Sequence, residues 1–154
     1  MTDTRPDSNA CPSPSAFRVA MARALHQLLD EPLVLKDPHA LGCLGAETAA
    51  TLLLDPDAHN DVAARSMRAG VVARSRFAED RLLRAIAAGV RQYAIVGAGL
   101  DTWALRAAQT LPSVHVYELD QPQMQAWKRQ VCADNGWILP PSLHRVPVDL
   151  RNDT

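Results

Sequence analysis

The sequence predicts an α/β protein in which a helical N-terminal part precedes the first half of a doubly wound parallel sheet. After Gly89, short apolar runs alternate with helical segments, as in successive strand–helix–strand units. Before Gly89, the apolar residues recur at helical spacing instead. A chain of 154 residues, 47% of them hydrophobic, is also long enough to bury a core.

Charge and composition exclude several classes of protein. Sixteen basic and seventeen acidic side chains give a net charge of −1, so neither nucleic acid nor an anionic membrane is an expected partner. No uncharged stretch reaches the roughly 18 to 20 residues of a membrane-spanning helix, and the polar N-terminus lacks the apolar segment of a signal peptide. Cys11, Cys43 and Cys132 have no metal-ligand spacing. We therefore expect a cytoplasmic protein with free thiols and no metal site.

The N-terminal part divides into a tail and a helical region. Residues 1–15 are polar and rich in proline and serine, which predicts a disordered tail. Residues 16–88 are predicted to form a helical cover. Its first helix is expected to be capped by Ser15 and to end before Pro32. The apolar positions of this helix step by four, four and three residues: Phe17, Met21, Leu25 and Leu28.

Two further helices are predicted before the first strand. They span residues 47–54 and 62–88, on either side of a turn that contains a proline. Gly70 leaves open whether the longer segment is one helix or two pieces. Gly89 then follows as a C′ glycine, with Val90 at the position of the apolar contact that accompanies this kind of cap.

Three strands and two helices are predicted in the remainder. The strands span residues 93–96, 114–119 and 144–149. One helix spans residues 101–109, and a second begins at Pro122, which suits a first helical turn. The second helix carries a stripe of predicted core residues: Met124, Trp127 and Val131. Pro147 cannot donate to a sheet ladder, so we place the third strand at an edge.

A glycine loop joins the first predicted strand to the next helix. Gly97 and Gly99 let the backbone approach a ligand closely at a helix N-terminus. Glu118 and Asp120 follow about 20 residues later, where an acid accepts hydrogen bonds from ribose hydroxyls. Thr102 replaces the third glycine of the dinucleotide motif, which favours a nucleoside over a dinucleotide. A strand–helix turn without any ligand is the remaining interpretation.

Longer blocks of the sequence carry further information. They comprise residues 23–26, 31–34, 74–80, 89–102, 117–122, 125–129 and 146–151. Together these blocks closely resemble the leucine carboxyl methyltransferase family, and its bacterial, mycobacterial-type branch in particular. The resemblance implies a Rossmann-like class I methyltransferase fold that binds S-adenosyl-L-methionine, and residues 89–154 would form the first half of that domain.

The resemblance also implies how the cofactor is held at its methionyl end. Arg74, with Arg76 as the alternative, would pair with the methionyl carboxylate, which suits the fork of a guanidinium. Gly97 would lie against the cofactor, and Gly99 would keep the loop open. The competing interpretation of the two arginines is an exposed helix face.

At the nucleoside end, the resemblance assigns the acids that end the second and third strands. Glu118 or Asp120 would accept hydrogen bonds from the ribose hydroxyls. Asp149, with Leu150 beside it, would accept a hydrogen bond from the adenine amine. The competing interpretation of Asp149 is a turn acid after a strand.

The activity implied by the resemblance is methyl transfer to the oxygen of a carboxylate or hydroxyl, on a small molecule or a peptide. No catalytic residue is assigned, and the five histidines form no cluster in the sequence: His26, His39, His59, His115 and His144. Two alternatives stay open. One is half of an NAD(P)- or flavin-binding oxidoreductase with the same glycine loop, and the other is a truncated, non-catalytic paralogue.

Members of the family continue well past the position that matches Thr154. Their fourth strand flanks the first strand, and the acceptor pocket lies in the same continuation. Without that strand, residues 93–96 would form an unpaired apolar edge. We therefore expect self-association through this edge, marginal stability, weak cofactor binding and slow turnover at most.

Overall fold

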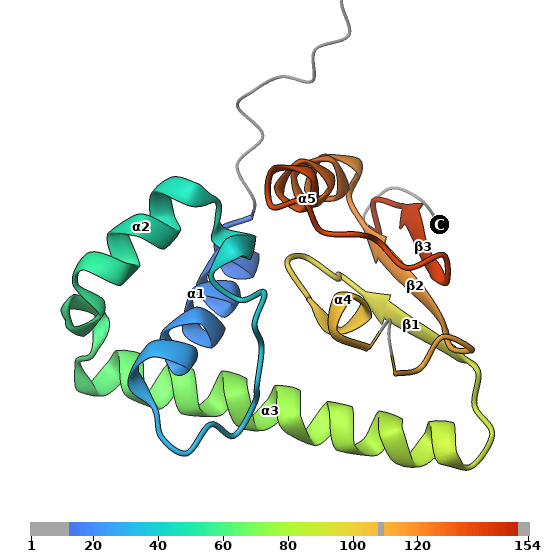
Figure 1. The fold of residues 1–154 in the computed structure, drawn as a ribbon, viewed down its shortest axis with the longest axis horizontal. Helices are drawn as coiled ribbons and strands as arrows, with labels where there is room; N and C mark the ends of the chain where they lie inside the picture. Colours follow the sequence, from blue (N-terminus) through green and yellow to red (C-terminus); the bar gives the residue numbers. More distant parts are fainter. Residues whose placement is uncertain (1–12, 108–109, 151–154) are drawn as a thin grey trace, which may run out of the picture.

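The computed structural model describes residues 13–107 and 110–150 and has an α/β architecture (Figure 1). Three helices precede the first strand: α1 (Pro14–Leu29), α2 (Ala46–Leu54) and α3 (Val62–Ala87). Strands and helices then alternate: β1 (Gln92–Val96), α4 (Trp103–Ala107), β2 (His115–Asp120), α5 (Pro122–Asp134) and β3 (Leu143–Pro147). Two short 3-10 helices, η1 (Gly42–Leu44) and η2 (Pro56–His59), flank α2. The predicted fold class is confirmed.

The three strands form one parallel sheet in the order β1–β2–β3. Val96 lies opposite Leu119, and Asp120 lies opposite Pro147, so the carboxyl ends of all three strands meet at one edge of the sheet. Within the described residues β3 pairs only with β2, so it takes the edge position that Pro147 predicts. Ligands of open α/β sheets bind outside this carboxyl edge.

Both α4 and α5 cover the same face of the sheet. The ring of Tyr93 packs edge-on against Trp103 of α4, with ring centroids 5.3 Å apart. On the neighbouring strand Glu118 pairs with Lys128 of α5. Side chains alternate between the faces of a strand, so Val96, three residues after Tyr93, points to the other face and is 63% exposed.

The first helix begins earlier than the sequence predicts. Ser13 is its N-cap, and the Ser13 Oγ accepts a hydrogen bond from the Ala16 N–H at 3.3 Å. Pro14 follows at the first helical position, which its fixed φ suits. The prediction that Ser15 caps the helix is therefore wrong, because Ser15 lies inside the first turn. Residues 1–12 of the predicted tail lie outside the described residues.

Helix α3 is a single continuous helix of 26 residues (Figure 1). Gly70 does not interrupt it, because its cost of about 1 kcal/mol relative to alanine is offset by the burial of Val71 and Val72 beside it. The predicted C′ glycine is confirmed: Gly89 has a φ of +105°, and the Val90 N–H donates to a carbonyl of the last helical turn.

Among the described residues, no helix combines the length and apolar character needed to cross a membrane.

Two apolar clusters hold the molecule together. The first joins the N-terminal helices to the sheet-bearing part, through Leu25 on α1, Leu100 after the glycine loop and Met124 on α5. The second packs Ile86 of α3 and Trp103 of α4 against the sheet. The core prediction for α5 is confirmed, with Met124 and Val131 buried and Trp127 packed on the first cluster. Cys43 and Cys132 are buried free thiols, as predicted.

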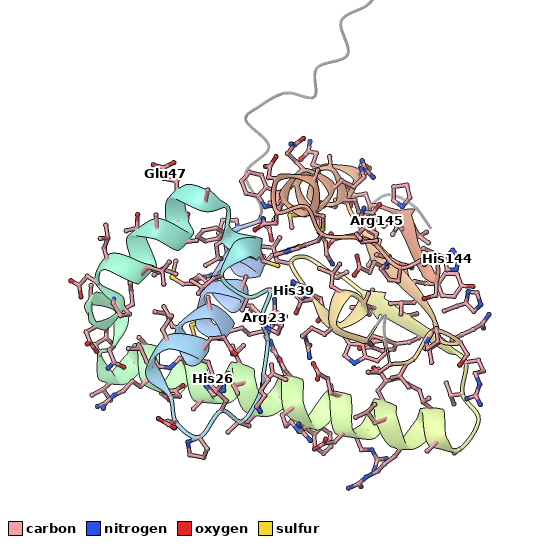
Figure 2. The ribbon with its side chains drawn as sticks, in the orientation of Figure 1. Arg23, His26, His39, Glu47, His144 and Arg145 are labelled. Carbon is pink, nitrogen blue, oxygen red and sulfur yellow. The ribbon has the colours of Figure 1, made fainter. Side chains whose placement is uncertain are left out.

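The structure places two histidines in contact, His115 and His144, that lie far apart in the sequence. The parallel register sets Tyr117 opposite His144, and their rings stack with centroids 4.7 Å apart. The Nδ1 of His115 lies 2.9 Å from the Nε2 of His144, which is labelled in Figure 2. This contact joins two of the five histidines, and their separation along the chain did not indicate it. Among the described residues, no group of three or more histidines, cysteines or acids could hold a metal ion.

Candidate functional site

A cleft of about 570 Å³ lies at the carboxyl edge of the sheet. Its walls come from the start of α1, the middle of α3, the end of β1 and the glycine loop. A smaller pocket of about 230 Å³ adjoins it and is bordered by Met124, Val148, Asp149 and Leu150. Ser13, Gly97 and Asp120 line both, so the two form one groove over the glycine loop. The larger volume is typical of a small-molecule site.

The glycine loop is tied to the end of β2. The N–H groups of Gly97 and Ala98 both donate to the Leu119 carbonyl, at 2.8 and 3.2 Å. Gly97 has a φ of +68°, and a Cβ built on it would meet no heavy atom within 4 Å. Gly99 has a φ of +50°, and its Cβ would lie 3.0 Å from the Ala16 Cβ. Gly97 is therefore required by its backbone conformation, and Gly99 also by the close approach of α1.

Asp120 lies at the junction of the two pockets. Its Oδ2 accepts a hydrogen bond from the Gly99 N–H at 2.5 Å, and its Oδ1 accepts one from the Gln121 N–H at 2.7 Å. These bonds fix the carboxylate in place. An ionised carboxylate offers about four acceptor positions, so each oxygen keeps capacity for a ligand hydroxyl.

Glu118 lies two positions before the end of β2 and lines neither pocket. It is 2% exposed, and its Oε1 accepts a hydrogen bond from the Lys128 Nζ at 2.7 Å. Asp120 follows Glu118 by two positions along β2, a distance of about 7 Å. Only Asp120 therefore reaches the carboxyl edge.

The two candidate arginines of α3 differ in direction. Arg74 lines the large cleft together with Ala78 of the next helical turn. Arg76 does not line it. The Arg76 side chain is half-exposed and forms an ion pair with Asp80 at 2.7 Å.

The segment that follows β3 borders the small pocket. The Val148 N–H donates to the Asp120 carbonyl at 2.9 Å, which fastens this segment to the end of β2. Asp149 and Leu150 then line the pocket beside Asp120. The structure thus brings together six of the eight candidate residues, all except Glu118 and Arg76.

The lining of the large cleft includes further polar and charged residues that the sequence analysis did not assign to it, among them Ser13, Arg23, Glu79 and Asp101. Arg23 and Glu79 lie inside blocks 23–26 and 74–80 of the family resemblance, and this position was the sequence signal that could have pointed to them. Asp101 directly follows the glycine loop.

A glycine loop after the first strand and an acid at the end of the second, both at the carboxyl edge of a parallel sheet, define the class of protein as Rossmann-like, an arrangement typical of nucleotide-binding folds. Comparison with known families agrees. The pattern of the leucine carboxyl methyltransferase family matches residues 16–154. The chain belongs to this family, so the resemblance found in the sequence is confirmed, and it groups the chain with methyltransferases rather than with oxidoreductases.

Individual relatives come from mycobacteria and carry the provisional name of S-adenosyl-L-methionine-dependent methyltransferase. A protein of Mycolicibacterium smegmatis is 37% identical over 150 residues, which is 90% of this chain and 48% of the relative. One of Mycobacteroides abscessus is 38% identical over 144 residues, 90% of this chain and 46% of the relative. One of Mycobacterium tuberculosis is 36% identical over 149 residues, 90% and 47% respectively. The chain thus spans about half the length of the curated relatives it matches.

Proposed function

We propose that this chain binds S-adenosyl-L-methionine along the groove and supplies the cofactor-binding elements of an O-methyltransferase. The acceptor would be a carboxylate or hydroxyl group on a small molecule or a peptide. The observation that carries the proposal is the meeting of the two pockets at Gly97 and Asp120, in a member of a methyltransferase family.

The polar groups along the groove fit the parts of this cofactor in their covalent order. Arg74, in the large cleft, would pair with the methionyl carboxylate. Asp120, at the junction, would accept hydrogen bonds from the ribose hydroxyls. Asp149 would accept from the adenine amine, with Leu150 against the ring, in the small pocket. Gly97 and Gly99 would let the backbone approach the cofactor.

The sequence left two choices open, one between two acids and one between two arginines, and the proposal chooses in each case the residue that lines the groove. Asp120 takes the ribose role in preference to Glu118, which is buried against Lys128. Arg74 takes the carboxylate role in preference to Arg76, whose guanidinium is engaged with Asp80.

When bound, the cofactor supplies an electrophilic methyl group on a sulfonium. The residues of the chain then have to hold it in line with an acceptor oxygen and exclude water. A carboxylate acceptor is already ionised at neutral pH, so it needs no general base. The proposal accordingly assigns binding and positioning roles, and no catalytic residue.

Calorimetric titration with S-adenosylmethionine, S-adenosylhomocysteine and NAD, each alone, tests the proposal. We expect binding of the first two and none of NAD. Binding of NAD together with no response to S-adenosylhomocysteine would contradict it.

The outer edge of β1 supports a separate proposal of self-association. Among residues 13–107 and 110–150, β1 pairs only with β2, and its residues Ala94 and Val96 are exposed. An apolar edge of this kind can pair with further backbone. Sedimentation of the wild type and of Ala94→Lys tests it. A concentration-dependent dimer that the lysine weakens is expected, and a wild-type monomer at all concentrations would refute it.

A further inference from the structure

A buried network of charged side chains lies behind the turn that follows the glycine loop. Its members come from four separate parts of the chain: Arg23 on α1, Asp37 in the link after α1, Glu79 on α3, and Asp101, Thr102 and Arg106 around the start of α4. Arg23, Asp37 and Thr102 are each at most 4% exposed. None of the roles proposed above uses this network.

Asp37 is the centre of the network. Its Oδ2 accepts a hydrogen bond from the Thr102 Oγ1 at 2.7 Å. The Arg106 Nε lies 3.6 Å from its Oδ1 and also donates to the Thr102 Oγ1 at 3.2 Å. The guanidinium of Arg106 forms a two-bond fork with the carboxylate of Glu79. The link after α1 is thus connected to both α4 and α3 through charged groups.

Arg23 connects α1 to the same turn and lies between α1 and the start of α4 (Figure 2). Its Nη2 donates to the Leu100 carbonyl, and its Nη1 lies 3.8 Å from the Asp101 Oδ2. The other oxygen of Asp101 accepts a hydrogen bond from the Trp103 N–H at 2.8 Å. One guanidinium therefore contacts two consecutive residues, directly after Gly99.

Stability alone does not account for this arrangement. Buried ion pairs lose so much hydration that apolar side chains of similar volume stabilise a fold as well or better. The Arg23 Nε is moreover buried without a hydrogen-bond partner among the described atoms. What the network does achieve is a fixed wall, because four of the residues that it includes or holds line the large cleft: Arg23, Glu79, Leu100 and Asp101.

We propose that Arg23 and Asp37 are positioning residues of the cofactor site, which hold the turn 100–102 in the shape that receives the cofactor. This inference rests on the proposed function. Asp120 fixes the backbone of Gly99 from the side of the sheet. Arg23 fixes the carbonyl of Leu100 from the side of α1. The two contacts clamp consecutive residues of the loop, so the N-terminal helices act on cofactor affinity as well as covering the fold.

The test measures the dissociation constant for S-adenosylhomocysteine and the thermal midpoint in matched variants. Arg23→Met keeps an unbranched apolar side chain but removes the guanidinium donors. Thr102→Val keeps the shape of the side chain and removes the hydroxyl that bonds Asp37 and Arg106. Arg68→Met is the control, because Arg68 is equally buried at 4% exposure and pairs with Asp30 away from the residues that line the cleft. We expect affinity to fall about 10-fold or more in Arg23→Met and Thr102→Val. Arg68→Met should lower the thermal midpoint and leave the affinity unchanged.

Chemical rescue separates positioning from a general loss of stability. In Arg23→Ala, millimolar methylguanidinium should restore part of the affinity, and in Arg68→Ala it should restore none. Unchanged affinity in both Arg23→Met and Thr102→Val, or an equal loss of affinity in Arg68→Met, would overturn this inference and leave the proposed function standing. If Arg23→Met does not fold, the affinity of Thr102→Val for S-adenosylhomocysteine alone tests the inference. A wild type that binds neither S-adenosylmethionine nor S-adenosylhomocysteine would overturn the proposed function and this inference with it.

Discussion

Asp120 accepts a hydrogen bond from the backbone N–H of Gly99, so the acid that ends β2 holds the second glycine of the loop. The two residues are 21 positions apart and come from neighbouring parallel strands and their connections. The acid that is proposed to bind the ribose therefore also shapes the loop on which the cofactor would lie. Removing this carboxylate should cost more than one ligand contact.

The first prediction concerns Asp120→Asn. An amide can turn only one acceptor oxygen toward the Gly99 and Gln121 N–H groups, both of which the carboxylate now satisfies. We expect affinity for S-adenosylhomocysteine to fall by about 2–4 kcal/mol, the sum of a charged ligand contact and a disturbed loop. Calorimetry measures this loss. Asp134→Asn, at an exposed acid of α5, is the control and should bind as the wild type does.

The second prediction concerns Asp149→Ala. Asp149 lines the small pocket, where the adenine amine is proposed to lie. Removing the acceptor should weaken binding by about 1–3 kcal/mol, the cost of an unpaired buried amine. The inosine analogue of S-adenosylhomocysteine lacks that amine, so the wild type should bind it more weakly, and the difference between the two dissociation constants should narrow in Asp149→Ala. An unchanged dissociation constant would mean that Asp149 is only a turn residue.

Position along the sequence could predict the loop and its acids, but not which acid reaches the edge. Glu118 and Asp120 are two positions apart and so point to the same side of a strand. The choice between them depends on where the strand ends and on Lys128, ten residues later, which pairs with Glu118. A sequence pattern does not reveal that pairing, because it depends on how α5 packs on the sheet.

The same limit applies to the helical part. Arg74 and Arg76 lie about 200° apart around a helix, and the packing of α3 on α1 decides which of them faces the cleft. Arg23 could be predicted as helical but not as buried, because arginine is rarely buried without a partner. Its partners, the Leu100 carbonyl and Asp101, follow more than 70 positions later.

The third prediction concerns the buried pair of Glu118 and Lys128. Glu118→Gln leaves the Lys128 ammonium buried without its counter-charge, because both residues are at most 4% exposed. The free energy of unfolding, measured with urea, should fall by about 3–5 kcal/mol. The double variant Glu118→Gln with Lys128→Met should recover much of this loss, since no buried charge remains. The folded single variant should keep its affinity for S-adenosylhomocysteine. A large loss of affinity would mean that Glu118, and not Asp120 alone, contributes to cofactor binding.

The fourth prediction concerns the pH dependence of stability at Asp30. Arg68 donates two hydrogen bonds to this carboxylate, at 2.9 and 3.0 Å, and the His26 Nδ1 lies 2.7 Å from it. The hydrogen bonds from Arg68 lower the pKa of Asp30 below its ordinary value, although burial opposes the shift. The unfolded chain therefore binds a proton at higher pH than the folded chain does.

The stabilisation from this pair is accordingly complete above the ordinary carboxyl pKa of about 4. It is lost as the pH falls through the lowered value of the folded state. We expect the wild type to unfold at higher urea concentration than Asp30→Asn at about pH 5, and the difference to shrink toward about pH 3. A difference between wild type and Asp30→Asn that stays constant over this range would mean that Asp30 titrates alike in the folded and unfolded chains.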